Sequence, residues 1–170
     1  MSGGVYWFTG LSGAGKSTVA SAFANFLTAR GERVQILDGD EIRAAVELSE
    51  FSLKSRREYL RMVAWGASLL ERQGVTVLVA VVSPERASRE FARKICKCFA
   101  EIYVATPLRV CEERDPKGLY RKSRDGKLSD LTGVDSPYEV PQHPELTIDT
   151  AECSIEGNLS KLELLFRSRR

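Results

Sequence analysis

Cysteine and histidine, the residues that most often build disulfide frameworks and metal centres, are scarce in this chain. Its 170 residues include four cysteines and one histidine. The cysteines, at positions 96, 98, 111 and 153, lack the paired C-x-x-C spacing of zinc sites, so we expect unbridged thiols in a reducing compartment. His143 lies between prolines with no visible ordering partner, which favours a surface loop over a catalytic role.

Long apolar runs and a strong excess of one charge are also missing. No stretch approaches the ~20 apolar residues of a membrane span, and the first residues lack the basic and apolar regions of a signal peptide. The net charge is only +2, and the basic cluster of residues 117–127 has no recognised nucleic-acid motif beside it. We therefore expect a cytoplasmic protein that binds neither membranes nor nucleic acid.

Apolar runs rich in β-branched residues alternate with helical patterns along the chain. The expected strands are residues 5–9, 34–37, 75–82, 102–105 and 146–148. Helical spacing of apolar residues follows Lys16 up to Gly31, and recurs from about 53 to 73 with Gly74 after it. This alternation predicts one α/β domain, residues 1–170, with a five-stranded parallel sheet covered by helices on both faces.

The stretch "GLSGAGKST" separates the first expected strand from the first expected helix. It fits G-x-x-x-x-G-K-[ST], the P-loop, whose backbone N–H groups point at the phosphates of a nucleotide. Lys16 should reach the β- and γ-phosphates of ATP, and the Ser17 hydroxyl should bind Mg²⁺. The expected cofactor-binding residues of this loop are Gly10, Leu11, Ser12, Gly13, Ala14, Gly15, Lys16, Ser17 and Thr18.

A P-loop serves kinases, switches and motors alike. A GTPase would carry an Asn-Lys-x-Asp guanine selector, which this sequence lacks, although residues 130–133 do read D-x-x-G like a GTPase switch element. A motor or transporter ATPase would be larger or have partner domains. A small-molecule kinase is the favoured class, and a nucleotide-dependent switch or binding protein is the alternative.

The second expected strand ends in "LDGDEIR", which places two carboxylates at the edge where open α/β sheets bind ligands. Asp38 or Asp40 could orient a magnesium-bound water or accept the proton of an acceptor hydroxyl, and Asp40 is the first candidate for the base. Arg43 could grip an anionic acceptor. The structural alternative is a strand-to-helix turn in which Asp40 caps the helix.

Residues 114–145 are rich in proline, glycine and basic side chains and show no clear strand. A segment of this length inside a compact domain is typical of a functional lid, because a core-like sequence resumes after it. The terminal stretch "LSKLELLFRSRR" has apolar residues at helical spacing and a basic end. It predicts a packed helix that could also form a homodimer contact.

Together these motifs resemble the adenylylsulfate kinases, which use MgATP to phosphorylate the 3′-hydroxyl of adenosine 5′-phosphosulfate in sulfate assimilation. The stretches that carry the resemblance are "GLSGAGKST", "LDGDEIR", "FSLKSRRE", "VVSPERASRE", "IYVATPLRVCEERDPKGLYRKSR" and "LTGVDSPYEVP". They run from about residue 5 to residue 150. The P-loop is shared by many families, whereas "DPKGLY" with "TGVDSPYE" is far more specific.

The resemblance implies a P-loop kinase fold, ATP and Mg²⁺ as cofactors, and roles for particular residues. Catalytic roles fall to Lys16, Asp38, Asp40 and Ser83, metal binding falls to Ser17 and Asp38, and Arg114 joins the ATP side. The residues implied to contact the acceptor nucleotide are Asp40, Arg43, Phe51, Arg56, Tyr59, Val82, Ser83, Lys117, Lys122, Leu131 and Thr132. Among them, Phe51 would stack on the base.

The chain departs from the family pattern mainly on the acceptor side. It lacks the usual His-Gly-Leu-Asn before Phe51, has Tyr59 where the family has an asparagine, and has Leu131 where the family has a phenylalanine. Loss of one aromatic face would weaken adenine stacking, by about 1–3 kcal/mol on a nucleic-acid scale. A relative that phosphorylates cytidine diphosphoramidate, used in capsule modification, is therefore an open alternative to the adenylylsulfate enzyme.

Overall fold

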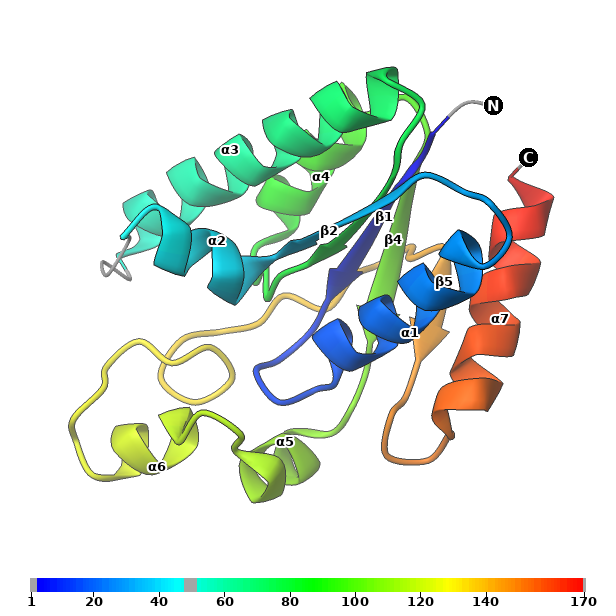
Figure 1. Cartoon of the computed structure of the whole chain (residues 1–170). Coiled ribbons are helices and arrows are strands. Elements are labelled where there is room, and N and C mark those ends of the chain that lie inside the picture. The colour runs from blue at the N-terminus through cyan, green and yellow to red at the C-terminus, as the bar shows by residue number, and fades with distance from the viewer. Residues whose placement is uncertain (1–2, 48–51, 170) are drawn as a thin grey trace.

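The structure is a computed structural model that describes residues 3–47 and 52–169. Five parallel strands form one sheet in the order β2-β3-β1-β4-β5 (Figure 1). They are β1 (Val5–Thr9), β2 (Val34–Asp38), β3 (Thr76–Ala80), β4 (Phe99–Val104) and β5 (Leu146–Ile148). The predicted α/β fold with a five-stranded parallel sheet is confirmed.

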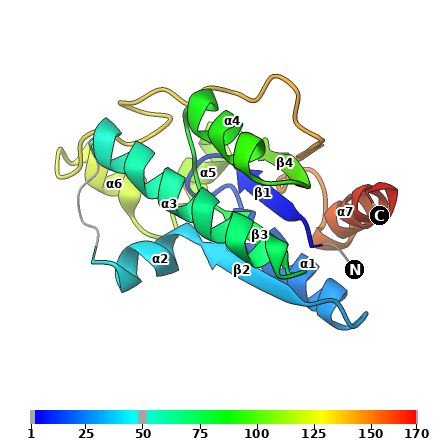
Figure 2. The same ribbon diagram turned by 90° about the horizontal axis from the view of Figure 1, so that it is seen from above.

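Helices cover both faces of this sheet, as Figures 1 and 2 show. α1 (Lys16–Thr28) packs beside α7 (Ile155–Ser168) on one face, and α3 (Leu53–Arg72) packs beside α4 (Arg86–Ile95) on the other. The short helices α2 (Gly39–Ala45), α5 (Leu108–Arg114) and α6 (Leu119–Arg124) lie toward the carboxyl ends of the strands. Among the described residues, no helix is long and apolar enough to cross a membrane.

The central strand β1 is buried on both sides because alternate side chains enter two separate cores. Tyr6 and Phe8 pack into the core under α1 and α7, whereas Val5 and Trp7 pack into the core under α3 and α4. The β1 side chains are all at most 5 % exposed. A continuous apolar run is what such a two-sided position requires.

Two expected strands differ from the observed ones by more than one residue at an end. β4 begins at Phe99, three residues before the predicted start. The prediction began too late because Glu101 interrupts the apolar pattern of the sequence. In the structure Glu101 is buried and accepts a hydrogen bond from Arg89 at 2.6 Å. β3 is shorter than predicted, since the chain leaves the sheet after Ala80 and turns toward the carboxyl edge.

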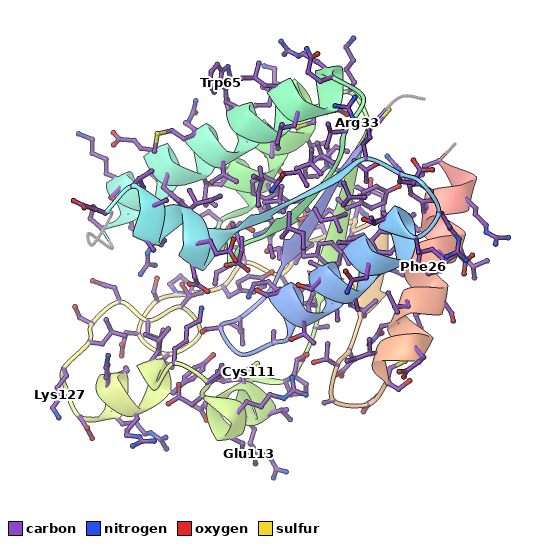
Figure 3. The ribbon with its side chains drawn as sticks, viewed as in Figure 1. Phe26, Arg33, Trp65, Cys111, Glu113 and Lys127 are labelled. Carbon is purple, nitrogen blue, oxygen red and sulfur yellow. The ribbon has the colours of Figure 1, made fainter. Side chains whose placement is uncertain are left out.

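The predicted lid segment 114–145 divides into two parts. Its first part contains α6 and carries the basic side chains on the outside of the molecule, with Lys127 at its outer end (Figure 3). Its last part is fixed to the body, because Glu139 N–H donates to the Pro84 carbonyl at 2.9 Å and Glu145 pairs with Arg93 at 2.5 Å. That residues 114–145 act together as a lid stays a prediction.

Candidate active site

The P-loop curls tightly between β1 and α1 because its glycines take left-handed backbone conformations. Gly13 has φ +75°, and a Cβ atom there would lie 2.9 Å from the carbonyl oxygen of Cys111. At Gly10, with φ +151°, a Cβ atom would lie 2.5 Å from the carbonyl oxygen of Val104. Figure 3 shows Cys111 below this loop. The predicted glycines are thus required both by the turn and by the close approach of neighbouring backbone.

Lys16, the first residue of α1, turns its ammonium group back across the loop. The Nζ atom donates to the carbonyl oxygens of Gly10 at 3.0 Å and Leu11 at 2.8 Å. Burial, followed by the nearby positive charge of Lys117, lowers the pKa of Lys16 to about 8. The loop therefore holds a cation, largely shielded from water, at the place where P-loop enzymes bind nucleotide phosphates.

Two threonines that sequence reasoning did not single out hold the P-loop backbone by hydrogen bonds. Thr106 and Thr150 donate their side-chain hydroxyls to the Ala14 carbonyl at 2.9 and 2.8 Å, respectively. Arg114 donates to the Thr150 hydroxyl at 2.7 Å and so ties the end of α5 to the same point. Each threonine stands two residues after a strand, β4 or β5, and that position is the signal that could have found them.

Ser17 and Asp38 lie side by side, as a shared magnesium site requires. The Ser17 hydroxyl donates to Oδ2 of Asp38 at 2.5 Å. The other carboxylate oxygen of Asp38 accepts the Asp40 N–H at 2.9 Å and caps α2. The cap is therefore Asp38, and the alternative interpretation, in which Asp40 caps the helix, is wrong. A hydroxyl and a carboxylate oxygen are ligands that suit Mg²⁺.

Asp40, the candidate base, is held at the mouth of the site by an ion pair with Lys117. The Asp40 side chain is 60 % exposed and that of Lys117 is 45 % exposed, so water screens the pair. This contact joins α2 to the chain between α5 and α6. The carboxylate and the lid lysine that the sequence predicts thus meet at one edge of the cavity.

A cavity of about 780 Å³ extends from the P-loop to α2, α3 and the lid. The predicted residues that line it are Ser12, Gly13, Gly15, Lys16, Ser17, Thr18, Asp40, Arg43, Arg56, Tyr59, Val82, Ser83, Arg114, Lys117, Leu131 and Thr132. Four other predicted residues are hydrogen-bonded to residues that line it: Gly10 and Leu11 to Lys16, Ala14 to Thr150, and Asp38 to Ser17. Phe51 lies outside the described residues.

Two arginines reach this cavity from the acceptor side. Arg56 donates to the Asp130 carbonyl at 2.5 Å and to the Thr132 hydroxyl at 3.4 Å, which links α3 to the lid. Burial lowers the pKa of Arg56. The guanidinium carbon of Arg43 lies 4.2 Å from the centre of the Tyr59 ring. The predicted anion-binding arginines are therefore brought together in the cavity wall.

Two predicted site residues occupy positions that differ from expectation. Ser83 is 2 % exposed, and its hydroxyl donates to Thr9 at 2.8 Å while it accepts the Trp7 indole N–H at 3.0 Å. The hydroxyl thus bonds toward the interior while Ser83 also lines the cavity, and its catalytic role stays a prediction. Lys122 is exposed on α6 and does not belong to the described cavity lining, because the helix turns it toward solvent.

The loop between β5 and α7 adds a part of the cavity wall that the sequence did not predict. Its cavity-lining residues are Thr150, Cys153 and Ser154, and Ile155 and Asn158 of the first turn of α7 line the cavity beside them. Asn158 is 1 % exposed and donates to the carbonyls of Asp149 and Cys153 at 3.2 and 3.3 Å, which closes the loop. The four cysteines are free thiols, as predicted.

A P-loop after the first strand, a carboxylate beside its serine and a cavity with two arginines define a P-loop kinase that acts on small molecules. Comparison with known proteins then narrows this class. A family model described as adenylylsulphate kinase matches residues 2–149. The chain belongs to the adenylylsulphate kinase family.

Individual relatives agree with this assignment. An adenylyl-sulfate kinase of Shewanella amazonensis is 49% identical over 164 residues, which cover 94% of this chain and 82% of that protein. One from Synechococcus is 48% identical over 150 residues, covering 88% and 86%. The APS kinase of Mycobacterium tuberculosis in complex with AMPPNP and APS superposes with a TM-score of 0.92 at 40% identity, covering 97% of this chain and 98% of that one.

Proposed function

We propose that this protein transfers the γ-phosphoryl group of MgATP to the 3′-hydroxyl of adenosine 5′-phosphosulfate. The observation that carries the proposal is that one cavity joins the P-loop to Arg43 and Arg56. A donor nucleotide on the P-loop and an acceptor with an anionic tail would therefore share a single cavity. Family membership supports both substrates, and the M. tuberculosis relative holds AMPPNP and APS together.

In this proposal the residues act mainly by positioning and by charge. Lys16 and the loop amides hold the donor phosphates, and Ser17 with Asp38 would hold Mg²⁺, which offsets the negative charge of the phosphates when it is bound. Asp40 accepts the proton of the acceptor hydroxyl, and its exposure leaves room for a substrate to displace Lys117. Closure of the lid over both nucleotides keeps water from consuming ATP.

A cytidine nucleotide with a small anionic tail, such as cytidine diphosphoramidate, is the second candidate acceptor. The cavity wall offers an aliphatic side chain at Leu131 and a phenol at Tyr59. Leu131 is 8 % exposed and packs within the core under α1, so it gives a base no flat aromatic face. A smaller base would lose less stacking energy than adenine when leucine replaces an aromatic side chain.

The proposed activity is tested by coupled ADP release with MgATP and a panel of acceptors. The panel contains adenosine 5′-phosphosulfate, cytidine diphosphoramidate and the plain nucleotides AMP and CMP. Turnover fastest with adenosine 5′-phosphosulfate supports the main proposal, and turnover only with the cytidine compound replaces it with the second. Lys16→Ala should remain folded and lose turnover with every acceptor; retained activity would refute the assignment of the P-loop.

Assembly and location are further parts of the proposal. The predicted homodimer contact of α7 stays a prediction, and its Leu164 is 69% exposed. A related APS kinase from Thiobacillus denitrificans, 30% identical over 98% of this chain and 29% of its own, is described as hexameric. We propose a cytoplasmic enzyme whose only substrates are nucleotides, and sedimentation at several protein concentrations would measure its oligomeric state.

A further inference from the structure

Tyr59 touches helix α2 at two points, although it belongs to α3. Its hydroxyl donates to the carbonyl oxygen of Gly39 at 2.8 Å. Its ring lies under the guanidinium group of Arg43, with 4.2 Å between the guanidinium carbon and the ring centre. Gly39 and Arg43 are four residues apart and so share one face of α2, which lets a single side chain contact both.

The fit between Tyr59 and α2 leaves little room for movement. A Cβ atom at Gly39 would lie 3.1 Å from a methyl group of Val81 and 3.4 Å from the Tyr59 hydroxyl. Tyr59 itself is 2 % exposed and packs in the core under α3 and α4. The phenol is therefore fixed by the body of the protein, while Arg43 lies on a helix of only seven residues.

We propose that Tyr59 is a positioning residue: it holds Arg43 and α2 so that the guanidinium group faces the anionic part of the acceptor. This inference rests on the proposed function for the identity of the acceptor. The Tyr59 hydroxyl already donates its hydrogen bond to Gly39, so it does not donate one to the acceptor. Tyr59 acts on the acceptor through Arg43, by a cation–π contact and by fixing the start of α2.

Two substitutions of Tyr59 distinguish the effect of its ring from the effect of its hydroxyl. Tyr59→Phe keeps the ring under Arg43 and loses only the hydrogen bond to Gly39, so the acceptor KM should rise about 2- to 5-fold. Tyr59→Leu removes the ring as well and should raise it on the order of 10-fold. The KM for ATP should stay within about 2-fold in both. An equal rise in both KM values would show a general structural role and overturn the proposal.

A double-mutant cycle tests whether Tyr59 works through Arg43. In an Arg43→Ala background, Tyr59→Leu should cause no further rise in the acceptor KM, because the group that it positions is gone. Additive effects would mean that Tyr59 acts without Arg43. Tyr120→Phe is the matched control: it also removes a buried hydroxyl that donates to a backbone carbonyl, Ser12 at 2.9 Å, but on the P-loop side. It should affect the ATP KM instead.

A measurement without substrate separates this inference from the proposed function. In ¹⁵N-labelled protein, the Arg43 side-chain signal, assigned by its loss in Arg43→Ala, should be shifted by the ring of Tyr59. The shift should persist in Tyr59→Phe and disappear in Tyr59→Leu. An unchanged Arg43 signal in Tyr59→Leu overturns the inference whatever the substrate is. Absence of turnover with adenosine 5′-phosphosulfate overturns the proposed function alone.

Discussion

Lys16 combines a role that the sequence predicts with an environment that it does not. The P-loop motif identifies the lysine, because the spacing of its glycines and the following serine is specific in a strand–loop–helix setting. Its burial against Gly10 and Leu11 depends on how the loop folds. The supporting threonines, Thr106 and Thr150, were missed for the same reason, since only the sheet order brings β4 and β5 next to the loop.

The lowered pKa of Lys16 predicts a pH effect on stability. The folded protein holds the Lys16 proton less tightly than the unfolded chain, with a pKa of about 8 against 10.5. Between these values the unfolded state binds more protons, so the free energy of unfolding rises with pH. Relative to Lys16→Met, the wild type should gain about 2 kcal/mol from pH 8 to pH 10 in urea unfolding.

An exposed lysine provides the control for this pH effect. Lys54→Met removes a side chain that is 87% exposed, and the difference between this variant and the wild type should stay nearly constant over the same range. If Lys16→Met and Lys54→Met follow the same pH dependence, the account of Lys16 as a buried cation in the P-loop is wrong.

Substitution of Leu131 tests whether the cavity wall determines which base of the acceptor nucleotide is bound. Leu131→Phe would add an aromatic face and should lower the KM for adenosine 5′-phosphosulfate, by about 5-fold or more on a stacking scale of about 1–3 kcal/mol. Leu128→Phe makes the same change at a half-buried lid leucine and should have little effect. No change, or a loss of turnover, in Leu131→Phe would contradict a base-contacting role for this position.

At the scale of elements, the strand and helix pattern could be predicted well where one physical signal dominates. β1 and β5 match their predicted ends, because apolar runs bounded by turn residues mark them. The start of β4 and the fixed end of the lid segment could not be predicted. Both depend on ion pairs between distant segments, which join Arg89 to Glu101 and Arg93 to Glu145.

The Arg89–Glu101 pair predicts a large effect on stability from one substitution. Arg89 is 2 % exposed and also donates to the carbonyls of Ser83 and Glu139, both at 2.6 Å. Arg89→Leu should leave the negative charge of the buried Glu101 with only the longer contact to Arg93. We expect the substitution to lower the free energy of unfolding by about 3–5 kcal/mol. Urea unfolding measures this loss.

A surface pair with the same shortest N–O distance serves as the comparison. Arg57 binds Glu85 at 2.6 Å, but its side chain is 59 % exposed. Arg57→Ala should lower the free energy of unfolding far less than Arg89→Leu does, because water screens the pair. Similar losses for Arg89→Leu and Arg57→Ala would mean that the network between α4, β4 and the end of the lid does not anchor that segment.

At the scale of the whole molecule, the sheet edge explains why distant motifs form one site. The P-loop follows β1, Asp38 ends β2 and Thr150 follows β5, so parallel strands bring them to one edge. The lid and α3 then complete a cavity of about 780 Å³. The fold class and the phosphate end of this cavity were predictable from sequence patterns. The residues of its acceptor end followed only from the family resemblance, and the Tyr59–Arg43 contact could not be predicted, because it joins two helices whose packing no local pattern specifies.

Identification of the product tests the central claim most directly. The enzyme, MgATP and adenosine 5′-phosphosulfate are incubated together, and the phosphorus resonances of the mixture are followed by NMR. The account predicts one new phosphomonoester signal coupled to the ribose H3′ proton, formed in step with ADP. Inorganic phosphate without this signal, or ADP release that does not depend on the acceptor, would contradict it.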